Sequence, residues 1–298
     1  MKAYKLSAVI LLLMMSIAAA LAYEPSGCGS SLKDGFFPDN QVISKAATAL
    51  NSNISRDRFD TLLNNLEKSY QAIFKNKQKR LIIKKDWGCD KNNAYATRGQ
   101  LREEGTVDLD ESIVIVNGGL ARYPLMTEDA LLLVVCHEIG HHIGGSPKKM
   151  RGNSQLVDWS AAEGQADYFA TTKCLKKIFA EPEFRLPKSL ETNNDVEKIC
   201  GTDMICNRIV NASLISAKIY ASISSTRASV DLFNTDRSEA YKTILTHPKP
   251  QCRLDTMVAG TLCPVDHNIG FDENDANLGA CLKTALDINE KNGARPSC

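Results

Sequence analysis

The amino-acid sequence predicts an α+β fold, mainly α, with a small antiparallel sheet and an active-site helix. Three observations lead to this prediction. Apolar residues recur at helical spacing between residues 40 and 76, short β-type runs follow between residues 81 and 116, and longer helical stretches fill the second half. No repeat and no low-complexity linker divides the chain, so we expect one main domain.

The first 22 residues are typical of a secretory signal peptide. Lys2 and Lys5 precede an apolar run, and the segment ends in Ala20-Leu21-Ala22, a small-residue cleavage pattern. An uncleaved anchor is the alternative, because the apolar run, although short for a full membrane span, is not far below the required length. We expect an exported protein, periplasmic or secreted, with no transmembrane segment in the mature chain.

Charge and cysteine content narrow the functional class. The chain has 36 basic and 35 acidic residues, and loss of Lys2 and Lys5 with the signal peptide leaves a net charge of −1. This balance argues against a nucleic-acid partner. All ten cysteines lie beyond residue 22, and in an exported chain they are expected to form disulfides.

The pairing of the cysteines is only partly readable. Cys200 and Cys206 are close enough in sequence for a local loop. The last three cysteines, Cys263, Cys281 and Cys298, are expected to tie down the tail. Cys136 and Cys174 lie in apolar helical contexts and are either disulfide-bonded or buried free thiols.

The elements follow in order along the chain. Residues 40–76 predict two amphipathic packing helices, and residues 81–83, 94–96 and 113–116 predict strands. Thr127 and the acidic residues after it predict the start of a helix that ends at Gly144-Gly145. Four later stretches are expected to form a surface loop and then three helices: 146–158, 160–177, 205–229 and 250–258.

The motif His137-Glu138-Ile139-Gly140-His141 lies on the helix that begins after Thr127. Residues four apart share a helix face, so the two histidine rings can converge on one ion. Glu163 is the natural third ligand, and two histidines with one glutamate are a standard set for one catalytic Zn²⁺ per chain. Glu138 lies about 100° round the helix, where it can take a proton from zinc-bound water as general base.

Several separate stretches between about residues 80 and 255 resemble the family of the CAAX prenyl endopeptidases, the heat-shock protease HtpX and their soluble periplasmic relatives. The resemblance rests on six segments: Asn93-Ala94-Tyr95-Ala96, Ile113 to Leu120, Thr127-Glu128-Asp129, His137 to His141, Glu163 to Asp167, and His247-Pro248 with Arg253. It implies a zincin-like metallopeptidase fold. Together with the residue patterns described above, the expected organisation is a signal peptide at 1–22, a helical segment at 23–76, a catalytic domain at 77–258 and a cysteine-containing tail at 259–298.

The resemblance also implies roles for residues outside the ligand set. Asp167 would accept the free ring N–H of a ligating histidine, expected to be His137. Arg253 would position the segment around it by pairing with a carboxylate. His247 would either donate a hydrogen bond to the oxyanion or occupy the open zinc position in a latched enzyme, and the sequence leaves both roles open.

The expected function is that of an exported zinc-dependent endopeptidase that acts on unfolded or extended protein segments. The strand at 113–116 is expected to be the sheet edge with which the substrate pairs. The alternative is a latched or inactive module of the same fold with a binding or chaperone-like role. The many cysteines depart from the family pattern, as does the short interval between His141 and Glu163.

Overall fold

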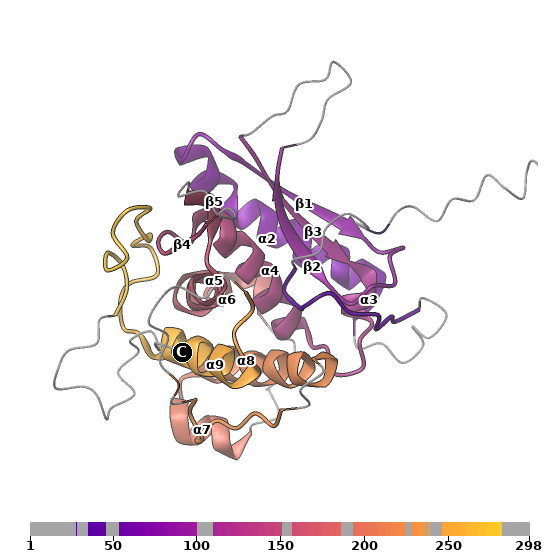
Figure 1. The fold of residues 1–298 in the computed structure, drawn as a ribbon, viewed down its shortest axis with the longest axis vertical. Helices are drawn as coiled ribbons and strands as arrows, with labels where there is room; N and C mark the ends of the chain where they lie inside the picture. Colours follow the sequence, from indigo (N-terminus) through magenta and orange to yellow (C-terminus); the bar gives the residue numbers. More distant parts are fainter. Residues whose placement is uncertain are drawn as a thin grey trace, which may run out of the picture.

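The computed structural model describes residues 28, 35–45, 54–99, 110–150, 157–185, 193–224, 228–236, 238 and 246–281. The expected signal peptide lies outside these residues. The predicted α+β fold with a small sheet is confirmed. Helix α4 (Glu128–Ile143) runs through the middle of the molecule, between the three-stranded sheet with α2 (Arg56–Asn76) and the pair α8 (Met204–Ile223) and α9 (Pro250–Leu262), as Figure 1 shows.

The three predicted strands are present as β1 (Arg80–Asp86), β2 (Ala94–Arg98) and β3 (Glu111–Asn117), in the order β1-β3-β2. The sheet is mixed, because β1 is parallel to β3 and only β2 is antiparallel to it. The expected antiparallel pairing is therefore present only in part, between β2 and β3. The expectation that β3 forms the edge is wrong, since β3 is the central strand and nearly all its residues are buried.

Only the second of the two predicted N-terminal helices is found among the described residues. Ser55 caps α2 by accepting a hydrogen bond from the Arg58 amide, and one face of the helix packs on β1. Residues 41–45 are not helical, and residues 46–53 lie outside the description. The 41–45 backbone bonds to the loop before β2 instead: Ser44 N–H donates to Asp90 O, and Ile43 bridges to Lys91.

Helix α4 begins as predicted, with the Thr127 hydroxyl accepting from the Ala130 amide. Almost every residue of α4 is buried, as expected for a helix enclosed on all sides. The helix ends at Ile143, with Gly144 as its C-cap. The predicted surface loop that follows is wrong in part, because β4 (Lys148–Met150) and β5 (Val157–Ala161) pair there as an antiparallel hairpin.

The second motif lies on a helical run that begins later than predicted. Strand β5 extends to Ala161, so α5 (Glu163–Phe169) begins at Glu163 rather than near residue 160. A π-helical turn, η2 (Ala170–Cys174), and α6 (Leu175–Phe179) continue it. The remaining described helices are α3 (Gly118–Ala121), η3 (Pro182–Phe184) and α7 (Asn194–Cys200).

Disulfides connect several of these elements. Among the described residues, they join Cys28 to Cys89, Cys136 to Cys174, Cys200 to Cys206 and Cys263 to Cys281. The local loop predicted for residues 200–206 is confirmed, and the open question for Cys136 and Cys174 is resolved as a disulfide between α4 and η2. Within the described part of the chain, no helix is long and apolar enough to span a membrane.

Candidate metal site

Three predicted ligands meet where α4 crosses the start of α5. His137 and His141 lie one turn apart on α4, and Glu163 is the first residue of α5. The Nε2 atom of His137 lies 3.2 Å from Glu163 Oε2, and that of His141 lies 3.6 Å from Glu163 Oε1. One ligand atom from each residue falls within 4.8 Å of the others, and all three side chains are buried. This group could hold a metal ion.

Both histidine rings are oriented through Nδ1. His137 Nδ1 lies 2.7 Å from Asp167 Oδ1, and His141 Nδ1 lies 2.8 Å from the backbone oxygen of Ala161. A carbonyl oxygen can only accept, so His141 carries its proton on Nδ1 and presents an Nε2 lone pair to the site. The carboxylate of Asp167 favours the same tautomer of His137. Such bonds fix ligand rings for a metal.

Arg253 on α9 completes the chain of contacts behind His137. Its Nε and Nη2 atoms donate to the two Asp167 oxygens at 2.8 and 2.7 Å. Burial alone would lower the pKa of Arg253, but the adjacent Asp167 carboxylate outweighs burial and holds that pKa above its ordinary value. The predicted pairing of Arg253 with a carboxylate is therefore present, and three helices, α4, α5 and α9, are joined at the site.

Two buried polar atoms of this group lack a hydrogen-bond partner. His137 Nε2 and Glu163 Oε2 are buried and form no hydrogen bond, although buried polar atoms nearly always do. A cation between them would satisfy both, and the set of two imidazole nitrogens and one carboxylate oxygen suits Zn²⁺. Lys149 on β4 also reaches this position, since its Nζ donates to Glu163 Oε1 at 2.6 Å.

Glu138 is the one acid beside the ligands without any hydrogen bond. Its side chain is 1% exposed, and neither carboxylate oxygen has a partner. Burial, opposed by His137 and reinforced by the negative charge of Glu163, raises the pKa of Glu138 to about 8. A carboxyl group with a raised pKa and free oxygens is suited to exchange a proton near neutral pH.

His247 reaches the same site from the segment before α9. Its Nε2 atom donates to the backbone oxygen of Gly35 at 2.6 Å and lies 3.8 Å from Glu163 Oε2. Burial lowers the pKa of His247, which favours a neutral ring with its proton on Nε2. His247 therefore acts here as a hydrogen-bond donor to a carbonyl group.

All seven residues singled out from the sequence converge on this region: His137, Glu138, His141, Glu163, Asp167, His247 and Arg253. Sequence reasoning missed Lys149, which falls in the stretch expected to be a surface loop. It also missed Gly35 and Phe36, whose backbone oxygens accept hydrogen bonds from His247 and Arg253. Their approach depends on tertiary contacts, and no motif around them signals it.

Searches against protein-family models, curated proteins and solved structures found no match to this chain.

Proposed function

We propose that this chain is an exported zinc-dependent endopeptidase of zincin-like fold, related to the CAAX prenyl endopeptidases and HtpX. The observation that carries the proposal is the buried group of His137, His141 and Glu163 beside the unpartnered carboxyl of Glu138. Export, to a periplasm or to the exterior, is inferred from residues 1–22 and from the disulfides.

The chain's own residues supply the proton transfers. When bound, Zn²⁺ would act as a Lewis acid and lower the pKa of its water toward about 7. Glu138 accepts the proton of the attacking water and passes it to the leaving amine. His247 donates from Nε2 to the oxygen of the carbonyl under attack, the kind of group that it bonds at Gly35.

The substrate-binding edge of the sheet is assigned to β2 in place of β3. The residues on either side of β2 bond to β3 through Asn93 O and Gly99 N–H. In an antiparallel pair only every second residue bonds to the neighbouring strand. The backbone groups of Ala94, Ala96 and Arg98 therefore face away from β3. Strand β2 also packs on α4. An extended peptide can pair with such an edge next to the ligands, which favours unfolded segments over compact proteins.

The test is zinc stoichiometry on the purified mature protein, combined with casein cleavage with and without a chelator. We expect one zinc per chain and chelator-sensitive cleavage. Glu138→Gln should retain the zinc and lose turnover by about a thousandfold or more. Well-folded protein without zinc, or full activity in Glu138→Gln, would contradict the proposal.

A latched module with a binding or chaperone-like role is the second candidate, because His247 Nε2 lies only 3.8 Å from Glu163 Oε2. His247→Ala separates the two. Lowered proteolysis assigns His247 to transition-state stabilisation, and raised proteolysis assigns it to a latch on the metal.

A further inference from the structure

A short N-terminal segment, Gly35–Phe37, contacts β2 on the side that faces away from β3. Phe36 N–H donates to Ala94 O at 3.0 Å. Phe37 N–H donates to Asn93 Oδ1, and Asn93 Nδ2 donates back to Phe37 O, both at 3.0 Å. Only the first of these bonds joins two backbone groups, and residues 35–37 form bends, so the segment contacts β2 without adding a further strand to the sheet. An extended peptide added to this edge would compete with the segment for the backbone oxygen of Ala94.

The polar side chains of the site hold the same segment. His247 donates to the oxygen of Gly35, and Arg253 Nη1 donates to the oxygen of Phe36 at 2.6 Å. The carbonyl of Gly35 thus occupies the position in which His247 would meet a carbonyl under attack. Two successive peptide oxygens are each bound by a side chain of the candidate site, which ordinary core packing does not require.

The ring of Phe36 fills a recess beside the ligands. It lies edge-on to His137 with 4.9 Å between ring centroids, and the Arg253 guanidinium lies 4.0 Å from its centre. The side chain is 1% exposed. Before it, a Cβ added to Gly35 would come within 2.3 Å of Ala94 O. The surroundings of the segment therefore have room only for glycine at position 35, whereas they enclose a large aromatic side chain at position 36.

We propose that Gly35–Phe37 is bound as an internal substrate and that the peptide bond between Gly35 and Phe36 is hydrolysed by this site. The inference rests on the proposed endopeptidase function and defines its substrate class: peptides with glycine before the scissile bond and an aromatic residue after it. While the segment is in place, other substrates are kept from this stretch of β2.

The chemical step is balanced by water alone. The water oxygen adds to the carbonyl carbon of Gly35, and Glu138 takes the proton released. The bond from that carbon to the Phe36 nitrogen then breaks as Glu138 gives this proton to the nitrogen, and the second proton of the water passes from the new carboxyl group to the amine. The products are a carboxylate at Gly35 and an ammonium group at Phe36.

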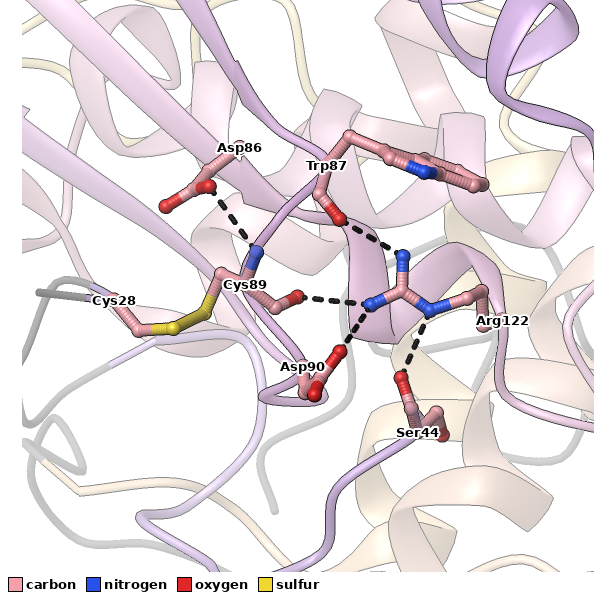
Figure 2. Close-up of a disulfide and its surroundings, with 7 residues drawn as sticks. All are labelled: Cys28, Ser44, Asp86, Trp87, Cys89, Asp90 and Arg122. Carbon is pink, nitrogen blue, oxygen red and sulfur yellow. Dashed lines mark hydrogen bonds and ion pairs between the residues drawn. A yellow bond between two sulfur atoms is a disulfide. The ribbon is translucent and has the colours of Figure 1, made fainter. Parts of the chain in front are cut away.

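Anchors on both sides keep the products in the molecule (Figure 2). Cys28 is joined to Cys89 by a disulfide before the segment. After it, Arg122 Nε donates to Ser44 O at 2.8 Å, and the same guanidinium contacts Trp87 O, Cys89 O and Asp90. Cleavage therefore leaves the upstream peptide attached until the disulfide is reduced.

The test is the intact mass of the zinc-loaded mature protein, followed over time with and without a reductant. Without reductant, we expect a gain of one water. With reductant, we expect a separate peptide that ends at Gly35 and a main chain that begins at Phe36. Glu138→Gln should remain uncut. Cleavage at this bond in Glu138→Gln would assign it to another protease and overturn the proposal.

Matched variants test the recess. Phe36→Ala should slow self-cleavage by about tenfold or more because the ring that seats the segment is lost. Phe59→Ala removes an equally buried ring from α2, and its self-cleavage should match wild type. Equal slowing in both variants would mean that lost packing, and not the recess, controls cleavage.

A binding measurement tests the same proposal without requiring peptide hydrolysis. In the Glu138→Gln background, adding Phe36→Ala should increase the affinity for an acetylated Gly-Phe-Phe amide by about tenfold, measured by calorimetry. Unchanged affinity would overturn the internal-substrate assignment. If zinc-loaded protein cleaves casein while its own Gly35–Phe36 bond stays intact, only the internal-substrate proposal is overturned. If zinc-loaded protein does not cleave casein, the result counts against the proposed endopeptidase function itself.

Discussion

The ammonium group of Lys149 competes with a metal ion for Glu163. Its Nζ bonds Glu163 Oε1, one of the atoms on which an ion would depend, and one positive charge so close disfavours a second. We expect Lys149→Met to tighten zinc binding by about tenfold, measured against a competing chelator dye. Lys148→Met is the matched control, because Lys148 bonds Trp159 O and Glu273 instead. Equal affinities in the two variants would contradict this account.

Lys173 makes stability depend on pH. Its side chain is buried in η2, where Nζ donates to Asp266 O and lies over the Phe271 ring. Burial, together with the nearby Lys176 charge, lowers its pKa from 10.5 to about 8. Between these two values the unfolded chain binds more protons than the folded one, so the contribution of Lys173 to the free energy of unfolding increases as pH increases.

We therefore expect the free energy of unfolding of wild type, relative to Lys173→Met, to rise by about 1 kcal/mol per pH unit from pH 8 toward 10. Below pH 8 the difference should be flat. Urea titrations at several pH values measure both proteins. Parallel curves across this range would show that Lys173 titrates normally in the folded state.

At the scale of elements, the packing of α9 on the π-helical turn sets the position of Arg253. A Cβ added to Gly260 would lie 2.2 Å from Thr171 Oγ1 and 2.8 Å from Thr172 Oγ1. We expect Gly260→Ala to push α9 away, lower the free energy of unfolding by about 2 kcal/mol and weaken zinc binding. Thermal unfolding and chelator competition measure the two effects.

Gly164 provides the control for that substitution. It follows the ligand Glu163 on α5, and an added Cβ would meet nothing within 4 Å. Gly164→Ala should be neutral or stabilising by up to about 1 kcal/mol, because alanine favours the helix. Loss of zinc in Gly164→Ala and not in Gly260→Ala would show that α9 does not position the site.

Local signals explain which elements the sequence predicts well. Helix α4 has a capping threonine, acids in its first turn and a terminal glycine, so its bounds are readable without knowledge of its neighbours. The pairing of β3 between β1 and β2 depends on contacts between distant residues, and alternation along one strand does not specify its partners. The hairpin of β4 and β5 is likewise not predictable from the sequence, because Lys148 and Lys149 are typical of an exposed loop.

The same distinction applies to the site. His137, His141 and Glu163 are readable because one turn of helix brings the histidines together and the donor set has a known chemistry. Lys149 and Gly35 reach the site through β4 and through a segment with no regular structure. The sequence around these two residues does not indicate that they lie near the site.

At the scale of the whole molecule, metal binding should be linked to folding. The ligands and their supports come from α4, α5 and α9, so the unfolded chain has no preformed site. Zinc at about a thousand times its dissociation constant should raise the free energy of unfolding by about 4 kcal/mol, and a chelator should reverse this. Glu163→Gln should show much less of the gain. Equal zinc effects in both proteins, measured by urea unfolding, would place the ion elsewhere.

The disulfide between Cys136 and Cys174 has a consequence for the order of maturation. Cys136 directly precedes the proposed ligand His137, and a free thiolate there would itself be a strong zinc ligand. Oxidation to the disulfide removes this competing thiolate, and the other disulfides likewise remove the thiolates of their cysteines. We therefore expect oxidative folding before zinc is supplied to give a correctly loaded protein, and we expect zinc supplied to the reduced chain to bind to cysteine sulfur instead.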